Sequence, residues 1–378
     1  MILALIILGL LLLYTYLIYP VILIFMANLR RQRRGDEGQK EMSFPYVSMV
    51  VSAYNEEKDI RGKIENFLSL DYPKEKLELV IGSDGSTDRT SLLVGSFPSE
   101  RIRFFEFGLR RGKVSILNDI VKEARGEIVV FSDADTIYDA NAIRNLIRHF
   151  VDNDVGGVCG KLALYETADS LAEEGLYWRY ENFIKRTEST IGTIVSINGQ
   201  IFAIRKKLFE KLPEYIITED QALGMSILSK GFKIVFDEDA IAREKIGNFK
   251  AEFERRVRIS AGNFQSISLS LKVLNPKMGF TSLFLWSHKI MRWLVPFFLL
   301  STYVINLFLL DIPIFQLTFF LQTIFYAVPI LYYVLTKTGL DVTIFKIVSY
   351  FIVMNLAILI GFFKYITKTQ KVTWQKAR

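Results

Sequence analysis

Short apolar runs recur through the first half of the chain, and stretches with helical periodicity separate them. The runs are nearly continuous, as expected for strands that are buried on both faces of a sheet. They lie at Val47–Ala53, Leu77–Ile81, Ile102–Phe107 and Ile128–Phe131. Between them, Lys113–Ala124 gathers its apolar residues on one face, as an amphipathic helix does. This alternation predicts an α/β fold, with a mostly parallel sheet flanked by helices and joined by right-handed crossovers.

The same alternation continues further along the chain. Val155–Leu164 and Thr193–Ile204 are candidates for further strands, and Phe232–Phe236 reads as another. Helices are expected at Ser170–Arg186 and at Gln221–Lys230, where Gly231 follows as a common C-terminal residue.

Phe249–Leu274 is a long amphipathic stretch with several arginines. One interpretation places it at a membrane surface, with apolar residues in the bilayer and arginines among the head groups. The other is a solvated helix packed on the preceding domain. The sequence leaves both open.

Both ends of the chain are strongly apolar. Met1–Met26 carries no charge and exceeds the roughly 20 residues that cross a bilayer. It lacks the basic start and small-residue cleavage site of a signal peptide, so we expect a retained anchor. Three more apolar segments lie at Trp293–Leu310, Ile314–Leu335 and Thr343–Tyr365. They help to explain why 51% of the residues are hydrophobic and the mean hydropathy is +0.25.

Basic residues adjoin these apolar segments. Arg30, Arg31, Arg33 and Arg34 follow the first one, which by the positive-inside tendency places the next region in the cytosol. The net charge of +7 fits contact with anionic membrane lipids. No basic stripe interleaved with aromatic residues suggests nucleic-acid binding. We therefore expect a multi-pass cell-membrane protein with a cytosolic domain.

The basic tail conflicts with a simple count of crossings. An anchor, a cytosolic domain and three full crossings would put the tail outside. Its charged residues favour the inside; they are Lys368, Lys371, Lys376 and Arg378. Either the tail breaks the rule, or one segment is interfacial or re-entrant.

These features divide the chain into six expected parts. They are an anchor (1–27), a basic linker (28–45), a cytosolic catalytic domain (46–245), interfacial helices (246–290), about three transmembrane segments (291–366) and a basic tail (367–378). Cys159 is the only cysteine, so neither a disulfide framework nor a cysteine metal site is expected.

Acidic residues stand where apolar strands end. Ser83–Asp88 follows one strand, Asp133-Ala134-Asp135 follows another, and Thr218-Glu219-Asp220 precedes a helix. In an open α/β sheet, ligands bind beyond the carboxyl ends of the strands. Two carboxylates one residue apart can approach a Mg²⁺ ion that also binds substrate phosphates. Glu219-Asp220 offers a general base.

Each of these motifs also has a purely structural interpretation. Asn55 and Glu56 can cap a helix, Asp84 can sit in a glycine turn, and Thr218-Glu219-Asp220 can be a cap. Lys113 opens a helix, where a cation is slightly unfavourable and where phosphate binding is the functional alternative. His149 is expected at the surface and His288 at a membrane boundary, so no histidine metal site is expected.

Taken in chain order, the motifs resemble those of the membrane-bound family 2 glycosyltransferases, which include hyaluronan, chitin and cellulose synthases. The resemblance covers about Val47 to Arg258. It implies a GT-A fold, a nucleotide-sugar donor that is usually UDP-linked, a Mg²⁺ or Mn²⁺ ion, and an inverting single displacement.

The resemblance also implies roles for individual residues. On the donor side, Ala53, Tyr54 and Glu56 would contact the nucleotide, Asp84 would contact the nucleotide base, and Lys113 would belong to the donor pocket. Asp133 and Ala134 would contact the donor, and Asp135 with Asp133 would bind the metal ion. On the acceptor side they are Asn198, Gly199, Gln200, Glu219, Arg255 and Arg258, with Asp220 as the base.

One motif departs from the processive synthases. Their Gln-x-x-Arg-Trp motif aligns with Arg255-Arg256-Val257-Arg258-Ile259, which keeps only the arginine. The missing Trp argues against processive synthesis, and three C-terminal segments can hardly enclose a polymer.

We therefore expect transfer to a glycan or lipid-linked acceptor in envelope polysaccharide assembly. A polyprenyl-phosphate glycosyltransferase is the alternative, and a non-catalytic polymer-export subunit is a weaker one. Membrane lipids are expected partners, while a homo-oligomer or an export partner is left open.

Overall fold

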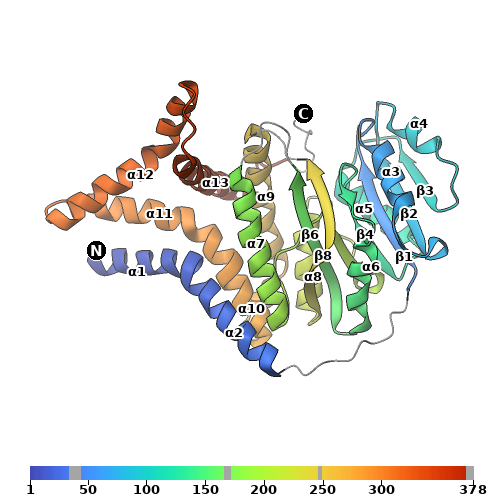
Figure 1. The fold of residues 1–378 in the computed structure, drawn as a ribbon, viewed down its shortest axis with the longest axis horizontal. Coiled ribbons are helices and arrows are strands. Elements are labelled where there is room, and N and C mark those ends of the chain that lie inside the picture. Colours follow the sequence, from blue (N-terminus) through green and yellow to red (C-terminus); the bar gives the residue numbers. More distant parts are fainter. Residues whose placement is uncertain (34–43, 166–171, 246–248, 372–378) are drawn as a thin grey trace.

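The computed structural model describes residues 1–33, 44–165, 172–245 and 249–371, and its centre is one mixed β-sheet (Figure 1). Eight strands of this described part are ordered β3-β2-β1-β4-β7-β6-β8-β5. The first four are parallel: β1 (Val47–Ala53), β2 (Leu77–Asp84), β3 (Ile102–Phe107) and β4 (Ile128–Phe131). Their carboxyl ends therefore lie at the same edge.

The second half of the sheet is mixed. β7 (Phe202–Arg205) runs antiparallel to β4 and to β6 (Val155–Tyr165), and β8 (Lys233–Lys245) runs parallel to β6. β5 (Ile137–Tyr138) pairs with β8 at the edge. The strand expected within Thr193–Ile204 is thus limited to β7, because the residues before it form a loop beside the site.

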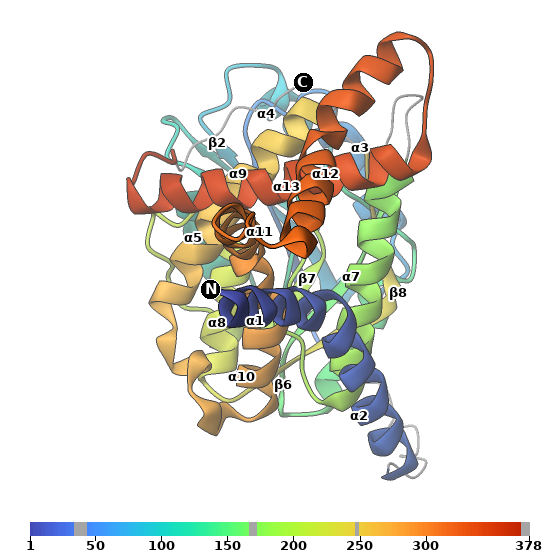
Figure 2. The same cartoon turned by 90° about the vertical axis from the view of Figure 1, so that its left-hand side faces the viewer.

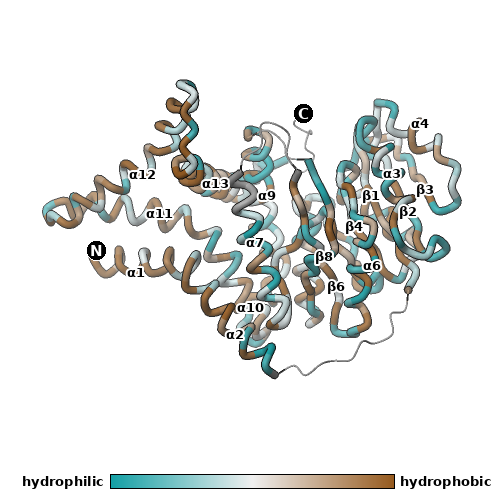
Figure 3. Tube along the Cα trace, in the orientation of Figure 1, coloured by the Kyte–Doolittle hydropathy of each residue, from teal (hydrophilic) through white to brown (hydrophobic). Residues whose placement is uncertain are grey.

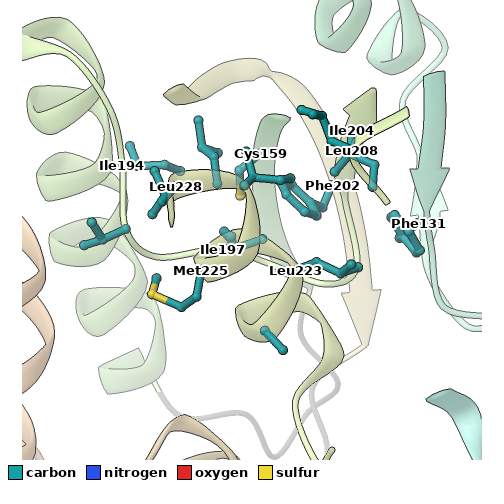
Figure 4. Close-up of a cluster of buried hydrophobic side chains, with 14 of the residues drawn as sticks. Phe131, Cys159, Ile194, Ile197, Phe202, Ile204, Leu208, Leu223, Met225 and Leu228 are labelled. Atoms are coloured by element: carbon teal, nitrogen blue, oxygen red, sulfur yellow. The ribbon is translucent and has the colours of Figure 1, made fainter. Parts of the chain in front are cut away.

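Helices bury both faces of the sheet. Met49 and Val51 of β1 pack in a core with α3 (Ile60–Ser69) and α6 (Ala142–Ile147), whereas Val50 packs on the opposite face. That second core includes α5 (Lys113–Glu123) and α8 (Glu219–Ser229). Figure 4 shows part of it, with Phe131, Phe202 and Leu223 in one layer. Burial on both faces explains why the strands read as continuous apolar runs.

Four helical segments are long and apolar enough to cross a membrane, by length and composition, within the residues described. The first joins α1 (Ile2–Leu13) and α2 (Tyr19–Arg33) through a π-helical turn, and the second joins α10 (Phe280–Phe284) to α11 (Met291–Leu307). α12 (Pro313–Lys337) and α13 (Thr343–Ile366) are the others. Much of the Cα trace of these helices is brown, for hydrophobic residues, in Figure 3. α13 lies across the direction of α1 and α11 (Figures 1 and 2).

α7 (Ala172–Ile191) and α9 (Phe249–Leu269) lie between the sheet and the apolar helices (Figure 1). α9 packs on the sheet domain, because a Cβ on Gly262 would lie 2.6 Å from the Thr218 methyl carbon. It also packs on α13, where a Cβ on Gly361 would lie 2.7 Å from the Val257 carbonyl oxygen. The amphipathic stretch is therefore packed on both sides.

The remaining helical predictions agree in place with α5, α7 and α8. His288 is fully buried within the protein, and its predicted position at a membrane boundary stays a prediction. Arg34 and most of the basic linker, together with Lys376 and Arg378 of the tail, lie outside the described residues.

Candidate functional site

The loops that follow β1, β2 and β3 form one wall of the site. β1 ends at the buried Ala53, and the ring of Tyr54 faces the guanidinium of Arg110 at 3.8 Å. The backbone N–H of Glu56 donates to the Thr90 hydroxyl at 2.8 Å, which joins the first loop to the second. The predicted nucleotide segment therefore lies beside the Asp84 loop.

Asp84 holds the start of α5. Its two carboxylate oxygens accept from the backbone N–H groups of Arg111 at 2.6 Å and Gly112 at 2.9 Å. Gly112 has a φ of 94°, a conformation that favours glycine. The same carboxylate was predicted to contact the nucleotide base. That role stays a prediction, since an ionised carboxylate has about four lone-pair sites and only two are used here.

Lys113 joins two acidic motifs that are far apart in the sequence. Its Nζ lies 2.6 Å from Asp133 Oδ1 and 2.5 Å from Glu219 Oε1. Burial works against the charged form of Lys113, but the two carboxylates outweigh it and raise the lysine's pKa. Burial likewise opposes the ionised Asp133, yet Lys113 lowers the pKa of Asp133 below its usual value. Both groups stay charged, so this ion pair is a fixed part of the site.

The Asp133-Ala134-Asp135 turn rests on a buried lysine that sequence reasoning missed. Lys63 of α3 donates from Nζ to the Ser132 hydroxyl at 2.6 Å and to the Thr136 carbonyl at 2.8 Å. Burial lowers the pKa of Lys63 to about 7. Ala134 is buried at the centre of this turn. These two hydrogen bonds hold the residues on either side of the turn and so position the two aspartates between them.

Asp220 stands in the first turn of α8 and faces the acceptor-side loop. Its Oδ2 accepts from the Gly199 N–H at 3.0 Å and its Oδ1 from the Gln221 N–H at 2.8 Å. Burial raises the pKa of Asp220 to about 6, and the charge of Glu219 adds to the rise. A carboxylate with this pKa can take a proton near neutral pH.

The loop that carries Asn198, Gly199 and Gln200 is held from several sides. The Asn198 side chain accepts from Lys185 at 2.6 Å and donates to the Gly160 carbonyl at 3.0 Å. The carbonyl of Gln200 accepts from the Tyr138 hydroxyl at 2.9 Å. These bonds fix the loop directly against Asp220.

Arginines of α9 close the other side. Arg255 Nη1 lies 3.4 Å from Glu244 Oε1, and Arg258 Nη1 donates to the Ile217 carbonyl at 3.5 Å. Burial lowers the pKa of Arg258, while Glu219 and Asp220 oppose this. Burial raises the pKa of Glu244 to about 7, with Asp133 and Asp135 contributing against the opposing Arg255. Glu244 was not predicted, because no motif marks this strand residue.

The predicted metal residues can be tested against their surroundings. Asp133 and Asp135 offer only oxygen atoms, which suits Mg²⁺ or Mn²⁺. No group of three or more His, Cys, Asp and Glu residues suited to a metal occurs in the described part of the chain. A Mg²⁺ ion commonly takes one or two carboxylates plus substrate phosphates. The residues therefore fit a metal that a diphosphate helps to hold, rather than a closed protein cage.

A cavity of about 790 Å³ begins at Asp220 and continues toward the apolar helices. Its lining comes from α7, α8, α9, α11 and α13, and from the loop around Asn198. No pattern in the sequence predicts this cavity, because its walls come from segments more than 150 residues apart.

A second charged cluster lies beside this cavity. Glu181 of α7 accepts from Arg292 at 2.6 Å, and His288 contacts both Glu181 and Glu188, at 3.2 and 2.8 Å. The Tyr19 hydroxyl donates to Glu188 at 2.6 Å. The cluster ties the N-terminal helix, α7 and the α10–α11 segment together. Sequence reasoning missed this cluster. The seven-residue spacing that puts Glu181 and Glu188 on one helical face is the pattern that could have indicated it.

Residues 48–213 match the family described as Glycosyl transferase family 2. The chain is 29% identical over 255 residues to the probable glycosyltransferase YdaM of Bacillus subtilis (strain 168), covering 63% of this chain and 60% of that protein. It is 29% identical over 231 residues to a poly-beta-1,6-N-acetyl-D-glucosamine synthase of Staphylococcus epidermidis, covering 58% of this chain and 55% of that protein. The chain thus spans little more than half the length of these curated relatives.

Among solved structures, the fold is similar to the mannosyltransferase PcManGT from Pyrobaculum calidifontis, which was solved in complex with GDP-Man and Mn²⁺. The TM-score is 0.73 at 20% sequence identity, and the match covers 97% of this chain and 99% of that chain. The similarity confirms the predicted fold class, an α/β sheet with flanking helices and apolar helices at both ends.

Proposed function

We propose that the protein transfers a sugar from a nucleotide-sugar to an acceptor hydroxyl, with inversion. The match of residues 48–213 to Glycosyl transferase family 2 supports this proposal. UDP is the nucleotide we favour. The acceptor is a glycan or a membrane-associated molecule in polysaccharide or envelope assembly. The observation that carries the proposal is the Lys113 bridge, which brings Asp133 and Glu219-Asp220 to one place.

In the proposed reaction, Asp220 takes the proton of the acceptor hydroxyl as its oxygen attacks the anomeric carbon. The bond between that carbon and the diphosphate oxygen breaks, and the nucleoside diphosphate leaves with the bonding electrons. The raised pKa of Asp220, about 6, supports this role because the base is ionised at neutral pH and still basic enough to accept a proton.

On the donor side, Asp135 with Asp133 would hold a divalent metal ion. Such an ion, when bound, offsets the charge that builds on the leaving diphosphate. Lys113 lies beside Asp133 and can contact the same diphosphate, which supports its place in the donor pocket. Asp84 keeps the backbone of residues 111–112 in place for this contact.

The direction of α13 supports a topology in which the tail is cytosolic. If α1, α11 and α12 cross the bilayer and α13 lies along its inner surface, both the catalytic domain and the tail are inside. This resolves the conflict between the basic tail and the number of apolar segments. Cys159 is buried, so single cysteines can report the topology: in intact cells an impermeant maleimide should label Asp311→Cys and spare Thr369→Cys. Labelling of Thr369→Cys would contradict it.

A donor panel tests the function. Purified protein is incubated with UDP-linked and GDP-linked sugars, with Mn²⁺ or Mg²⁺, and release of the nucleoside diphosphate is followed. We expect release that depends on both the metal and Asp135, with Glu65→Ala, an exposed surface change, as the matched control for Asp135→Ala. Calorimetry should show nucleotide binding that needs Mn²⁺. A wild-type rate in Asp135→Ala would refute the metal assignment, and no release with any donor would refute the proposed function.

A further inference from the structure

The cavity that begins at Asp220 changes character along its length. Near the base it is lined by polar groups of the Asn198 loop. Its far wall is α13, where Ile347, Phe351, Met354 and Ile358 form an apolar stripe at helical spacing beside the polar Tyr350 and Asn355. α13 lies on the side of α9 that faces the other apolar helices (Figure 1). One ligand that fills this cavity must therefore be polar at the base and apolar along α13.

The cavity wall carries an excess of positive charge. Five Arg or Lys side chains and two Asp or Glu side chains line it: Arg179, Arg255, Arg256, Lys289 and Arg292 against Glu181 and Asp220. Arg255 and Arg256 are already paired with Glu244 and Glu252, which do not line the cavity, so the positive charge that matters for a ligand is that of Lys289 and Arg292. Lys289 and Arg292 share the Glu181 carboxylate, at 3.5 and 2.6 Å. One carboxylate cannot neutralise two cations, so this wall favours an anionic group.

The cationic wall and the base are close in space. Lys289 donates to the Ser196 hydroxyl at 2.6 Å, and Asp220 accepts from the Gly199 N–H at 3.0 Å. Three residues of backbone span at most about 10 Å. An anionic group at Lys289 and a hydroxyl at Asp220 can therefore belong to one head group.

We propose that this cavity binds the acceptor, and that the acceptor is a membrane lipid whose sugar is attached through a phosphate or diphosphate. The inference rests on the proposed function and names its acceptor class. The sugar hydroxyl faces Asp220, the phosphate faces Lys289 and Arg292, and the hydrocarbon chain follows the α13 stripe. Charge complementarity and the apolar stripe favour this occupant over a growing neutral glycan.

Binding to two matched probes tests the inference. One is N-acetylglucosamine linked through a diphosphate to a farnesyl chain, and the other is the farnesyl glycoside of the same sugar without phosphate. Both are titrated against the full chain in nanodiscs. Lys289→Gln keeps a donor for Ser196 and removes the charge, and we expect it to weaken the diphosphate probe about tenfold and to spare the glycoside. Lys122→Gln, on an exposed position of α5, is the charge control.

The apolar stripe is tested separately. Met354→Trp fills the cavity with an indole ring. It should weaken the binding of both probes about tenfold or more, because the farnesyl chain can no longer occupy that space. Leu356→Trp, on the exposed face of the same helix, is the matched control. Ile358→Phe is a milder variant in case Met354→Trp does not fold, as judged by thermal unfolding.

The outcomes separate the inference from the proposed function. Equal affinity for both probes in the wild type, or equal effects of Trp at 354 and 356, would overturn the lipid-phosphate acceptor. So would unchanged transfer to a soluble glycan in Met354→Trp, which would leave the proposed function standing. Lipid binding with no donor turnover for any acceptor would instead overturn the proposed function.

Discussion

The pKa of a carboxylate is lowered on the donor side of the site and raised on the acceptor side. On the donor side, Lys113 outweighs burial and lowers the pKa of Asp133. On the acceptor side, burial and Glu219 raise the pKa of Asp220 to about 6, although the Gln221 N–H opposes this. Asp133 contacts Lys113 directly, and Asp220 follows Glu219, which also contacts Lys113, yet the pKa values of the two aspartates shift in opposite directions.

The difference fits the roles proposed for the two sides. A carboxylate that holds a metal and a diphosphate should remain an anion at every working pH, and a direct ion pair ensures this. A general base should be able to accept a proton, so it is better placed next to another anion and away from a direct cation. Among the ion pairs of the described residues, Lys113 contacts Asp133 and Glu219 and not Asp220. It also lowers the pKa of Asp220, but burial and Glu219 outweigh it there, so the two pKa values differ.

Removing the proposed general base should lower activity more than any other change. Asp220→Asn keeps the shape of the side chain and its acceptor for the Gly199 N–H, but it cannot take a proton. We expect kcat to fall by roughly 10²–10⁴-fold, with metal-dependent nucleotide affinity unchanged in calorimetry. Asp154→Asn, at a side chain that is 71% exposed, is the control. Normal turnover in Asp220→Asn would show that another group is the base.

Removing the shared cation should affect both sides at once. Lys113→Met leaves Asp133 and Glu219 without this partner and removes a contact to the diphosphate. We expect kcat/KM for the donor to fall by about 10²-fold, because the variant loses a charge-assisted contact to the donor diphosphate. Lys113→Arg should restore part of the rate.

Lys122→Met, at the other end of the same helix, is the matched control for Lys113. Donor titrations with each variant provide the measurement. If Lys113→Met lowered kcat only through the acceptor, with the donor KM unchanged, the bridging role would be wrong.

The donor side was largely predictable from the sequence, because parallel strands bring successive loops to one edge. Tyr54, Asp84 and Asp133 each follow a buried strand, so their meeting follows from the strand pattern. The fold class was predictable for the same reason. Lys63 was not, since a buried lysine inside α3 resembles any polar residue on an amphipathic helix.

The acceptor side was much less predictable, because it is formed by tertiary packing of distant helices. The position of Glu219-Asp220 suggested a general base, but only the resemblance to a family motif singled out Asp220. The cavity beyond it needs α7, α9 and α13 side by side, and no local pattern encodes that. His288 illustrates the limit: no local pattern predicted that it is buried in the cluster around Glu181.

The fit between Gly199 and Asp220 can be tested with a single methyl group. A Cβ on Gly199 would lie 2.9 Å from Asp220 Oδ2, which is too close for the carboxylate to keep its place. We expect Gly199→Ala to lower kcat about tenfold, since small misplacements of a reacting group are costly. Gly62→Ala, where a Cβ has nothing within 4 Å, should leave kcat unchanged. An equal effect at both positions would remove the argument for tight placement.

The smallest expected effect is a shift of the pH profile, and it tests the cause of the pKa difference directly. Only the ionised Asp220 can accept a proton, so kcat/KM for the acceptor should rise with pH through about 6 and then level off. Glu219→Gln removes the neighbouring negative charge that raises the pKa of Asp220, so the rise should move to lower pH. Glu123→Gln, on the exposed end of α5, should leave the profile in place. Steady-state rates between pH 4.5 and 8, as a range of roughly two pKa units around the base, give the midpoint. A move to higher pH would mean that Glu219 stabilises the charged form of Asp220, which would contradict the proposed cause of its raised pKa.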